Sequence, residues 1–342
     1  MTEIYNQIID HPGAWTNRSI GGKAGLVYKL EEKHLKAVEE LLKKTRHLAP
    51  QEVTRQDFDH PDLNPMLADV FDILLNGRGA VIIQGVTKER FAREDFERIY
   101  WGFGTHWGVG VTQSALGDKL GRVTFTPVGP GNPTNRAYRG NQELTLHTDT
   151  NEIVGLMCEE KAAEGGFSQL ASVLAVHNEI FKTRPDLLPA LYRGHEYAIN
   201  EASLSSKPVT PYKIPVFSCV DGKVSMLYVD SQIRKAAEKM GETFPADLDE
   251  AMKYLNEVAA REDIQINYMI EPGEIMVVNN FITMHARTEF KDSATQKRSL
   301  LRMWLDVPHG RPVCEAYKAK AKYYAGLFPG KDARADAVVA GS

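Results

Sequence analysis

Cysteine is scarce in this chain of 342 residues, which contains only Cys158, Cys219 and Cys314. The three are far apart and odd in number, which argues against a disulfide framework and against a cysteine-based zinc module. We expect each to be a small apolar core residue, because free cysteine is among the most buried residue types. This sparse usage is typical of a reducing, cytoplasmic setting.

Long hydrophobic runs and blocks of positive charge are also missing. Nowhere do 18 uncharged apolar residues follow one another, so we expect no membrane-spanning helix. The first residues, MTEIYNQIID, have no basic stretch followed by an apolar one, and we therefore expect no signal peptide. The net charge is −4 and there is no long basic run, so neither nucleic acid nor a membrane is an expected partner.

Glycine motifs for nucleotides are absent as well. Neither G-x-G-x-x-G after a strand nor G-x-x-x-x-G-K-[ST] occurs, and the regular alternation of strand and helix expected for a doubly wound fold is missing. Hydrophobic residues make up 43% and charged residues 25%, which is ordinary for a soluble globular protein. The length allows one elaborated domain or two.

Helical patterns dominate the first hundred residues. Apolar residues at helical spacing among lysines and glutamates predict an amphipathic helix over about 30–46. Two further helices are predicted at 65–76 and 93–104, with the strand AVIIQG between them. Residues 108–141 are rich in Gly, Pro, Asn and Thr, and we expect a loop there with a short strand at 122–127.

From about residue 144 the pattern changes to β. Strands are predicted at 144–147, 153–158, 168–173, 195–199, 215–219, 223–229, 265–271, 274–279 and 298–306, with helices at 174–184 and 247–260. Asp221-Gly222 predicts a hairpin, and Pro272-Gly273 predicts a turn that joins another strand pair. Many short strands with few helices indicate a mainly β fold with flanking helices (α+β), built on a sandwich or barrel.

The segment LTLHTDTNEIVGLM places two metal-binding side chains inside an apolar stretch. A strand directs residues i and i+2 to one face, so His147 and Asp149 point together. His285 follows the strongly apolar strand predicted at 274–279, which favours an inward position at a barrel mouth. Two imidazoles and a carboxylate leave three positions open on an ion, which is the facial arrangement of non-haem Fe(II) oxygenases. H-x-D alone also fits a surface turn or a hydrogen-bonded core pair.

The segment KRSLLRMWLDV contains two arginines on one predicted strand face. Arg298 and Arg302 flank Leu300 there and would project inward. A buried guanidinium needs an anion, and its fork matches a carboxylate. The pair therefore favours two anionic ligands, or one ligand with two carboxylates. The alternative is one solvated arginine and one arginine paired with a core acid.

The segment AAEGGFSQLAS offers a third feature. Gly165-Gly166 before a predicted strand allows the backbone to come close to a bound group. Ser168 then presents a hydroxyl on the inward face. A plain hairpin turn with a capping serine is the alternative.

Together these segments resemble the taurine dioxygenase-like (TauD/TfdA) family of Fe(II)/2-oxoglutarate oxygenases, and the clavaminate synthase branch has a similar pattern. The resemblance covers residues from about 79 to 306. It rests on the ordered set of H-x-D, G-G-x-[ST], a distal histidine and R-x-x-x-R. The fold it implies is a double-stranded β-helix, a jelly roll with helices packed outside.

The resemblance also implies a cofactor site. By position, His147, Asp149 and His285 match the ligands of Fe(2+), and they would be the catalytic centre. Arg298 matches the arginine that holds the distal carboxylate of 2-oxoglutarate, the co-substrate used together with dioxygen. Ser168 stands where the family usually has threonine, in contact with the same carboxylate.

For the substrate, the resemblance implies a small anionic molecule, an amino acid or related acid. Arg302 matches a position that often binds a substrate anion, and Asn280, in the stretch before His285, is expected to border the substrate together with loop 108–141. The implied reaction oxidises a C–H bond and releases succinate and CO2. Hydroxylation, desaturation and cyclisation all stay open. A zinc-type metal hydrolase and a non-catalytic β-sandwich binding protein are the alternatives.

We expect three parts along the chain. Residues 1–78 would form an N-terminal helical extension packed on the core, residues 79–310 the oxygenase domain, and residues 311–342 a C-terminal tail. The expected partner is a small-molecule substrate, and self-association into a homo-oligomer stays open.

Overall fold

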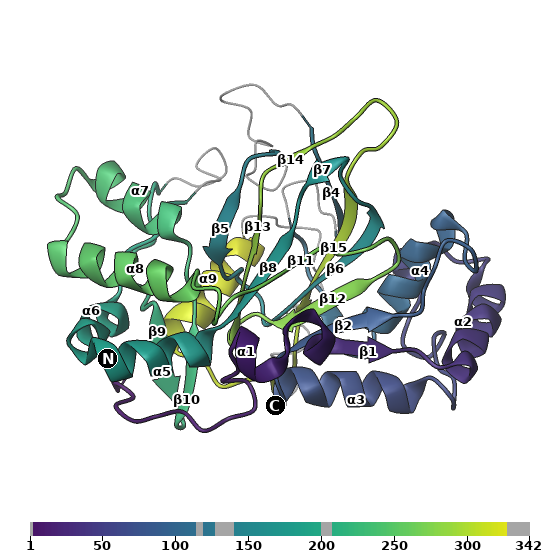
Figure 1. The fold of residues 1–342 in the computed structure, drawn as a ribbon, viewed down its shortest axis with the longest axis horizontal. Helices are drawn as coiled ribbons and strands as arrows, with labels where there is room; N and C mark the ends of the chain where they lie inside the picture. The colour runs from purple at the N-terminus through teal and green to yellow at the C-terminus, as the bar shows by residue number, and fades with distance from the viewer. Residues whose placement is uncertain (1–2, 114–118, 127–139, 200–206, 327–342) are drawn as a thin grey trace.

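The computed structural model describes residues 3–113, 119–126, 140–199 and 207–326. In these ranges, β-strands form the centre of the molecule and helices pack on both sides of them (Figure 1). The larger sheet consists of β1 (Val27–Lys29), β2 (Ala80–Gln84), β3 (Val109–Gly110), β4 (Leu120–Thr124), β6 (Ile153–Glu160), β12 (Ile275–Asn279) and β15 (Ser299–Asp306). The smaller sheet consists of β5 (Leu144–His147), β8 (Ser168–Ser172), β11 (Ile266–Tyr268) and β13 (Thr283–Arg287).

Strands that are distant in the chain are neighbours in both sheets. The larger sheet has the order β1-β2-β12-β6-β15-β3, with β4 beside β15, and the smaller sheet has the order β11-β8-β13-β5. The central pairings, such as β12 with β2 and β6 and β13 with β8 and β5, are antiparallel. Two such sheets in one core are the architecture of a jelly roll. The prediction of a mainly β jelly roll with flanking helices is therefore confirmed.

Apolar side chains on alternate residues of the strands form a core between the two sheets. Leu170 and Ile266 of the smaller sheet pack with Ile82, Val154 and Met276 of the larger one. All five side chains are at most 1% exposed. Burial of side chains of this size contributes about 1.5–3 kcal/mol each, so this layer is a main source of stability.

The opposite face of the larger sheet is covered by α2 (Glu32–Thr45), α3 (Asn64–Leu75) and α4 (Arg93–Gly104). In β15, Leu301, Met303 and Leu305 pack with these helices, while Leu300 joins the core between the sheets. The period of two in this strand thus sends one residue set to the helices and the other inward.

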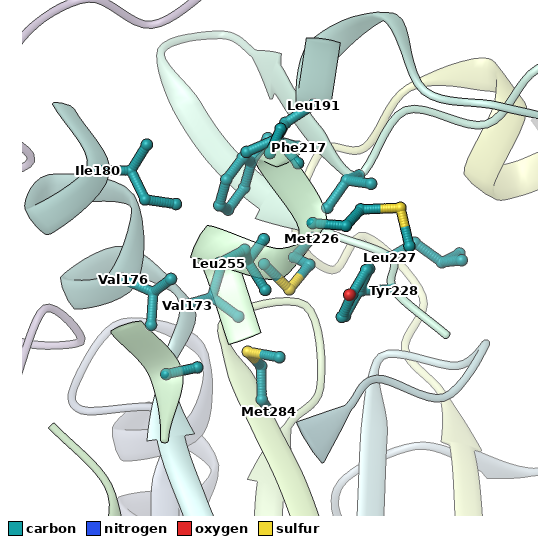
Figure 2. Packing of buried hydrophobic residues seen from close by; sticks show 14 of the residues in the cluster. Val173, Val176, Ile180, Leu191, Phe217, Met226, Leu227, Tyr228, Leu255 and Met284 are labelled. Carbon is teal, nitrogen blue, oxygen red and sulfur yellow. The ribbon is translucent and has the colours of Figure 1, made fainter. Parts of the chain in front are cut away.

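The smaller sheet is covered by α5 (Val173–Thr183), α6 (Leu188–Arg193), α7 (Asp230–Met240) and α8 (Ala246–Ala259), together with a hairpin of β9 (Phe217–Val220) and β10 (Lys223–Met226). Figure 2 shows Val173, Val176 and Ile180 of α5 in one cluster with Met284 of β13. Their helical spacing gives α5 its apolar face. The hairpin predicted at Asp221-Gly222 is present and joins β9 to β10.

Three local predictions were wrong. Pro272-Gly273 connects β11 to β12, but these strands lie in different sheets, so the turn is a crossover and not a hairpin. Residues 195–199 form only isolated bridges, His195 with Ile214 and Ala198 with Val209. No strand was predicted at His285, which follows β12 as expected but itself lies inside a further strand, β13. Local pattern cannot decide these points, because pairing between distant segments does.

The segments at both ends of the described chain join the core. β1 pairs in parallel with β2, and a short helix α1 (Asn17–Ile20) precedes it. At the other end lies α9 (Glu315–Gly326), whose Tyr317 is 1% exposed. A further small ladder pairs β7 (Glu164–Gly165) with β14 (Phe290–Lys291). The division of the chain at residues 78 and 310 stays a prediction.

Candidate functional site

A pocket opens between the two sheets, and strands of both contribute to it. Its empty volume is about 590 Å³, which includes space open to solvent. The lining residues are Val123, Leu144, His147, Asp149, Val154, Leu156, Ser168, Gln169, Leu170, Met276, His285, Ala286, Arg287, Arg298, Leu300 and Arg302. Six of the seven predicted site residues are among them.

Two imidazoles and a carboxylate converge in this pocket. In the ladder of β5 and β13, His147 lies directly opposite His285, and their ring centroids are 4.4 Å apart. Asp149 Oδ2 lies 3.4 Å from His285 Nε2. One ligand atom from each of the three residues lies within 4.8 Å of the others, so a single ion can contact all three. The described residues contain no other such group of histidine, cysteine and acidic side chains.

Neighbouring groups hold these side chains in place. His147 Nδ1 lies 2.8 Å from the carbonyl oxygen of Thr145, which leaves Nε2 as the nitrogen that faces an ion. The indole nitrogen of Trp304 donates to Asp149 Oδ2 at 3.0 Å. The Asn280 side chain accepts from the backbone nitrogen of Asp149 and donates to its carbonyl oxygen, both at 2.8 Å. Nitrogen and oxygen donors supported in this way fit Fe(II).

The electrostatics keep these groups in the protonation states that a metal requires. Burial, together with the charge of His285, lowers the pKa of His147 to about 4, so this imidazole is neutral at pH 7. Burial alone would raise the pKa of Asp149. The hydrogen bond from His285 and the charges of both histidines and Arg302 outweigh it and hold that pKa below the usual range. A neutral imidazole and an ionised carboxylate are the ligand forms.

Arg298 marks one end of the pocket. Its side chain is 4% exposed, and burial together with the charge of Arg287 lowers its pKa to about 10, so it stays charged at pH 7. Within the described ranges no carboxylate lies at ion-pair distance from its guanidinium. Gly166 lies beside Arg298, and its φ of 74° is a backbone conformation that favours glycine. Ser168 lines the same pocket.

Arg302 lies next to Trp304, whose indole nitrogen donates to Asp149. Its guanidinium lies 4.7 Å from the ring centroid of Trp304, and its Nε donates to Gln113 Oε1 at 2.6 Å. Gln113 is 2% exposed and also donates to the carbonyl oxygen of Arg302 at 2.7 Å. This glutamine was missed, because it lies in a loop with no periodic pattern.

One predicted site residue is not in the pocket. Asn280 is fully buried, and both atoms of its amide are used by the backbone of Asp149, so the expectation that it borders the substrate is wrong. Arg287 lines the pocket and was not predicted, because His285 was placed outside a strand. Of the predicted substrate loop 108–141, residues 114–118 and 127–139 lie outside the described residues.

The described residues include no helix that is long and apolar enough to cross a membrane.

Comparison with known proteins gives the family. Residues 44–304, well over half of the chain, match the model of the family described as "Taurine catabolism dioxygenase TauD, TfdA family". The match begins earlier than the segment near residue 79 where the resemblance starts. The alternatives of a zinc hydrolase and of a non-catalytic binding protein are thereby set aside.

Two curated relatives are similar over most of their length. "FR-33289 synthase" of Streptomyces rubellomurinus (strain ATCC 31215) is 26% identical over 327 residues, which cover 91% of this chain and 94% of that protein. "Taurine hydroxylase-like protein SAT17" of Stachybotrys chartarum (strain CBS 109288 / IBT 7711) is 28% identical over 309 residues, which cover 85% of this chain and 77% of that protein.

Solved structures share the fold. An asparagine oxygenase in complex with Fe(II), 2S,3S-3-hydroxyasparagine and succinate has a TM-score of 0.62 at 18% identity, over 82% of this chain and 93% of that one. The non-heme iron oxygenase OrfP with Fe, succinate and (3S)-hydroxy-L-Arg has a TM-score of 0.60 at 12% identity, over 82% and 94%. The chain belongs to the TauD/TfdA family and is an Fe(II)- and 2-oxoglutarate-dependent oxygenase that uses dioxygen.

Proposed function

We propose that His147, Asp149 and His285 hold the Fe(II), and that Arg298 with Ser168 holds the distal carboxylate of 2-oxoglutarate. The observation that carries this assignment is the convergence of the three donor atoms within 4.8 Å, in one pocket with a buried guanidinium. An unpaired buried guanidinium is costly, and a carboxylate matches its fork.

The chemistry divides between the cofactors and the chain. When bound, iron and 2-oxoglutarate supply oxidation of a substrate C–H bond by dioxygen, with release of succinate and CO2. The chain supplies position: Trp304 and Asn280 fix Asp149, and the carbonyl of Thr145 fixes the tautomer of His147. Apolar lining residues such as Leu156 and Leu300 keep water away from the reacting bond. Small displacements decide which C–H bond reacts.

The proposed substrate is a small anionic molecule, an amino acid or related acid, whose anionic group binds Arg302. Two observations support this class. Arg302 lines the pocket and contacts Trp304, which donates to Asp149. Two solved structures of the same fold hold 2S,3S-3-hydroxyasparagine and (3S)-hydroxy-L-Arg. The proposal covers hydroxylation, desaturation and cyclisation.

Anaerobic titration with Fe(II) and 2-oxoglutarate tests the site. We expect a weak visible charge-transfer band from the wild type and none from His285→Ala. The control His60→Ala removes an imidazole that contacts Glu40 outside the pocket, and it should keep the band. A wild type without the band contradicts the proposal. A screen of amino acids and small acids for succinate release then tests the substrate class.

A further inference from the structure

Arg287 has a buried guanidinium group, and the function proposed above assigns no role to it. Its side chain is 5% exposed and lines the pocket. Nη2 donates to the carbonyl oxygens of Gly140 (3.0 Å) and Gln142. Nε and Nη1 are buried and have no hydrogen-bond partner among the described residues. A buried charge with free donors indicates an oxygen-bearing ligand.

Strand register places Arg287 at the end of the pocket that is remote from the metal site. On β13, His285 is opposite His147 and Leu170, whereas Arg287, two residues further, is opposite Ser168. Two residues of a strand span roughly 7 Å. This is comparable to the length of 2-oxoglutarate between its metal-binding end and its distal carboxylate. Arg287 therefore lies at the level that the tail of the keto acid reaches.

Arg287 and Arg298 share one aromatic ring there. Their guanidinium carbons lie 4.6 Å and 5.2 Å from the ring centroid of Phe290. Such contacts stabilise each cation but leave two positive charges close together. Within the described ranges no carboxylate forms an ion pair with either guanidinium. An anion between them would relieve the repulsion and supply acceptors for the free donors.

We propose that Arg287 is a second binding residue for the distal carboxylate of 2-oxoglutarate, next to Arg298, and that the pair selects keto acids with two carboxylates. This inference rests on the function proposed above. The competing explanation is that Arg287 acts only as a clamp on the carbonyls of Gly140 and Gln142.

A cycle of two proteins and two ligands separates these explanations. 2-Oxopentanoate has the same keto-acid end as 2-oxoglutarate and the same number of carbons, but it ends in a methyl group. We would measure the Kd of both ligands by anaerobic titration of the visible band with Fe(II). Arg287→Met should weaken 2-oxoglutarate by about 10- to 100-fold, the effect of one hydrogen bond to a charged group. It should change 2-oxopentanoate by less than about threefold.

Arg78→Met is a matched control, because it removes a guanidinium that, in the described part of the chain, donates only to backbone carbonyl oxygens. Arg78 donates to the carbonyl oxygens of Ala80 and Leu26 and does not line the pocket. It should lower the Tm and leave the ratio of the two Kd values unchanged. If Arg287→Met does not fold, Arg287→Gln carries the test, because its amide still donates to a carbonyl while the charge is removed.

The outcomes are distinct. If neither Kd changes in the folded Arg287 variant, the inference is overturned and the proposed metal site is unaffected. Equal weakening of both ligands also overturns it, because the effect then concerns the keto-acid end. A wild type that shows no band with either ligand overturns the proposed function as well.

Discussion

Replacing Trp304 by phenylalanine removes one hydrogen bond from Asp149 and little else. The indole nitrogen donates to Asp149 Oδ2 at 3.0 Å. Phenylalanine keeps an aromatic face for the guanidinium of Arg302, which lies 4.7 Å from the Trp304 ring centroid. The substitution therefore tests whether a residue that does not itself bind the ion sets the metal affinity of the site.

The expected magnitude follows from the charge and exposure of the acceptor. A hydrogen bond to a charged group contributes about 1.5–3 kcal/mol, and each 1.4 kcal/mol corresponds to about tenfold in affinity. The Asp149 side chain is 16% exposed, so water partly replaces the lost donor. We expect the lower part of the range, about a tenfold increase in the Kd for Mn(II), used as a redox-stable substitute for Fe(II).

Titration calorimetry with Mn(II) measures this effect. Trp15→Phe is the matched control, because its indole donates to the carbonyl oxygen of Arg78 at 2.7 Å and Trp15 does not line the pocket. It should lower the Tm without a change in the Kd for Mn(II). If Trp304→Phe binds Mn(II) within twofold of the wild type, the hydrogen bond does not position the carboxylate, and the reasoning is refuted.

Four further substitutions test other parts of the structure. Arg302→Gln should raise the KM for the substrate more than that for 2-oxoglutarate, and Arg298→Gln should do the reverse; equal effects in steady-state kinetics contradict the assignment. Burial raises the pKa of Glu152 to about 7. The contribution of Glu152 to the stability of the folded protein is therefore fully present below about pH 4.5 and is lost as the pH rises through 7. Glu152→Gln should therefore increase the free energy of unfolding at pH 8 by up to about 3 kcal/mol, with little change near pH 4.5, as measured by denaturant titration at both. Asn280→Ala leaves the backbone of Asp149 without two hydrogen-bond partners and should lower the free energy of unfolding by about 1–3 kcal/mol in the same assay. An unchanged unfolding midpoint would show that these two hydrogen bonds do not stabilise the protein.

Local pattern was sufficient for much of the fold. The strand at 144–147 and the helices near 30–46 and 65–76 have bounds within two residues of those predicted, because amphipathic periodicity reflects which face is buried. Helix α7 was missed, since its buried residues are only Ile233, Ala236 and Ala237, and a single large apolar side chain does not mark a helix face in the sequence.

Crossover connections escaped prediction for a different reason. The turn at Pro272-Gly273 has the composition of a hairpin, yet the strands on its two sides pair with β8 and β6 in separate sheets. A turn sequence specifies a reversal of direction, whereas the partner of each strand depends on the whole core.

The sequence by itself determined which side chains were available for the chemistry: an H-x-D pair, a distal histidine, two arginines at strand spacing and a serine after two glycines. Only the tertiary structure decided how they meet. The register of β13 against β5 and β8 puts His285 opposite His147 and Arg287 opposite Ser168. The same packing turns the amide of Asn280 toward the backbone of Asp149 and away from the pocket. Contacts between segments more than 100 residues apart depend on how two sheets pack, and no local pattern encodes that.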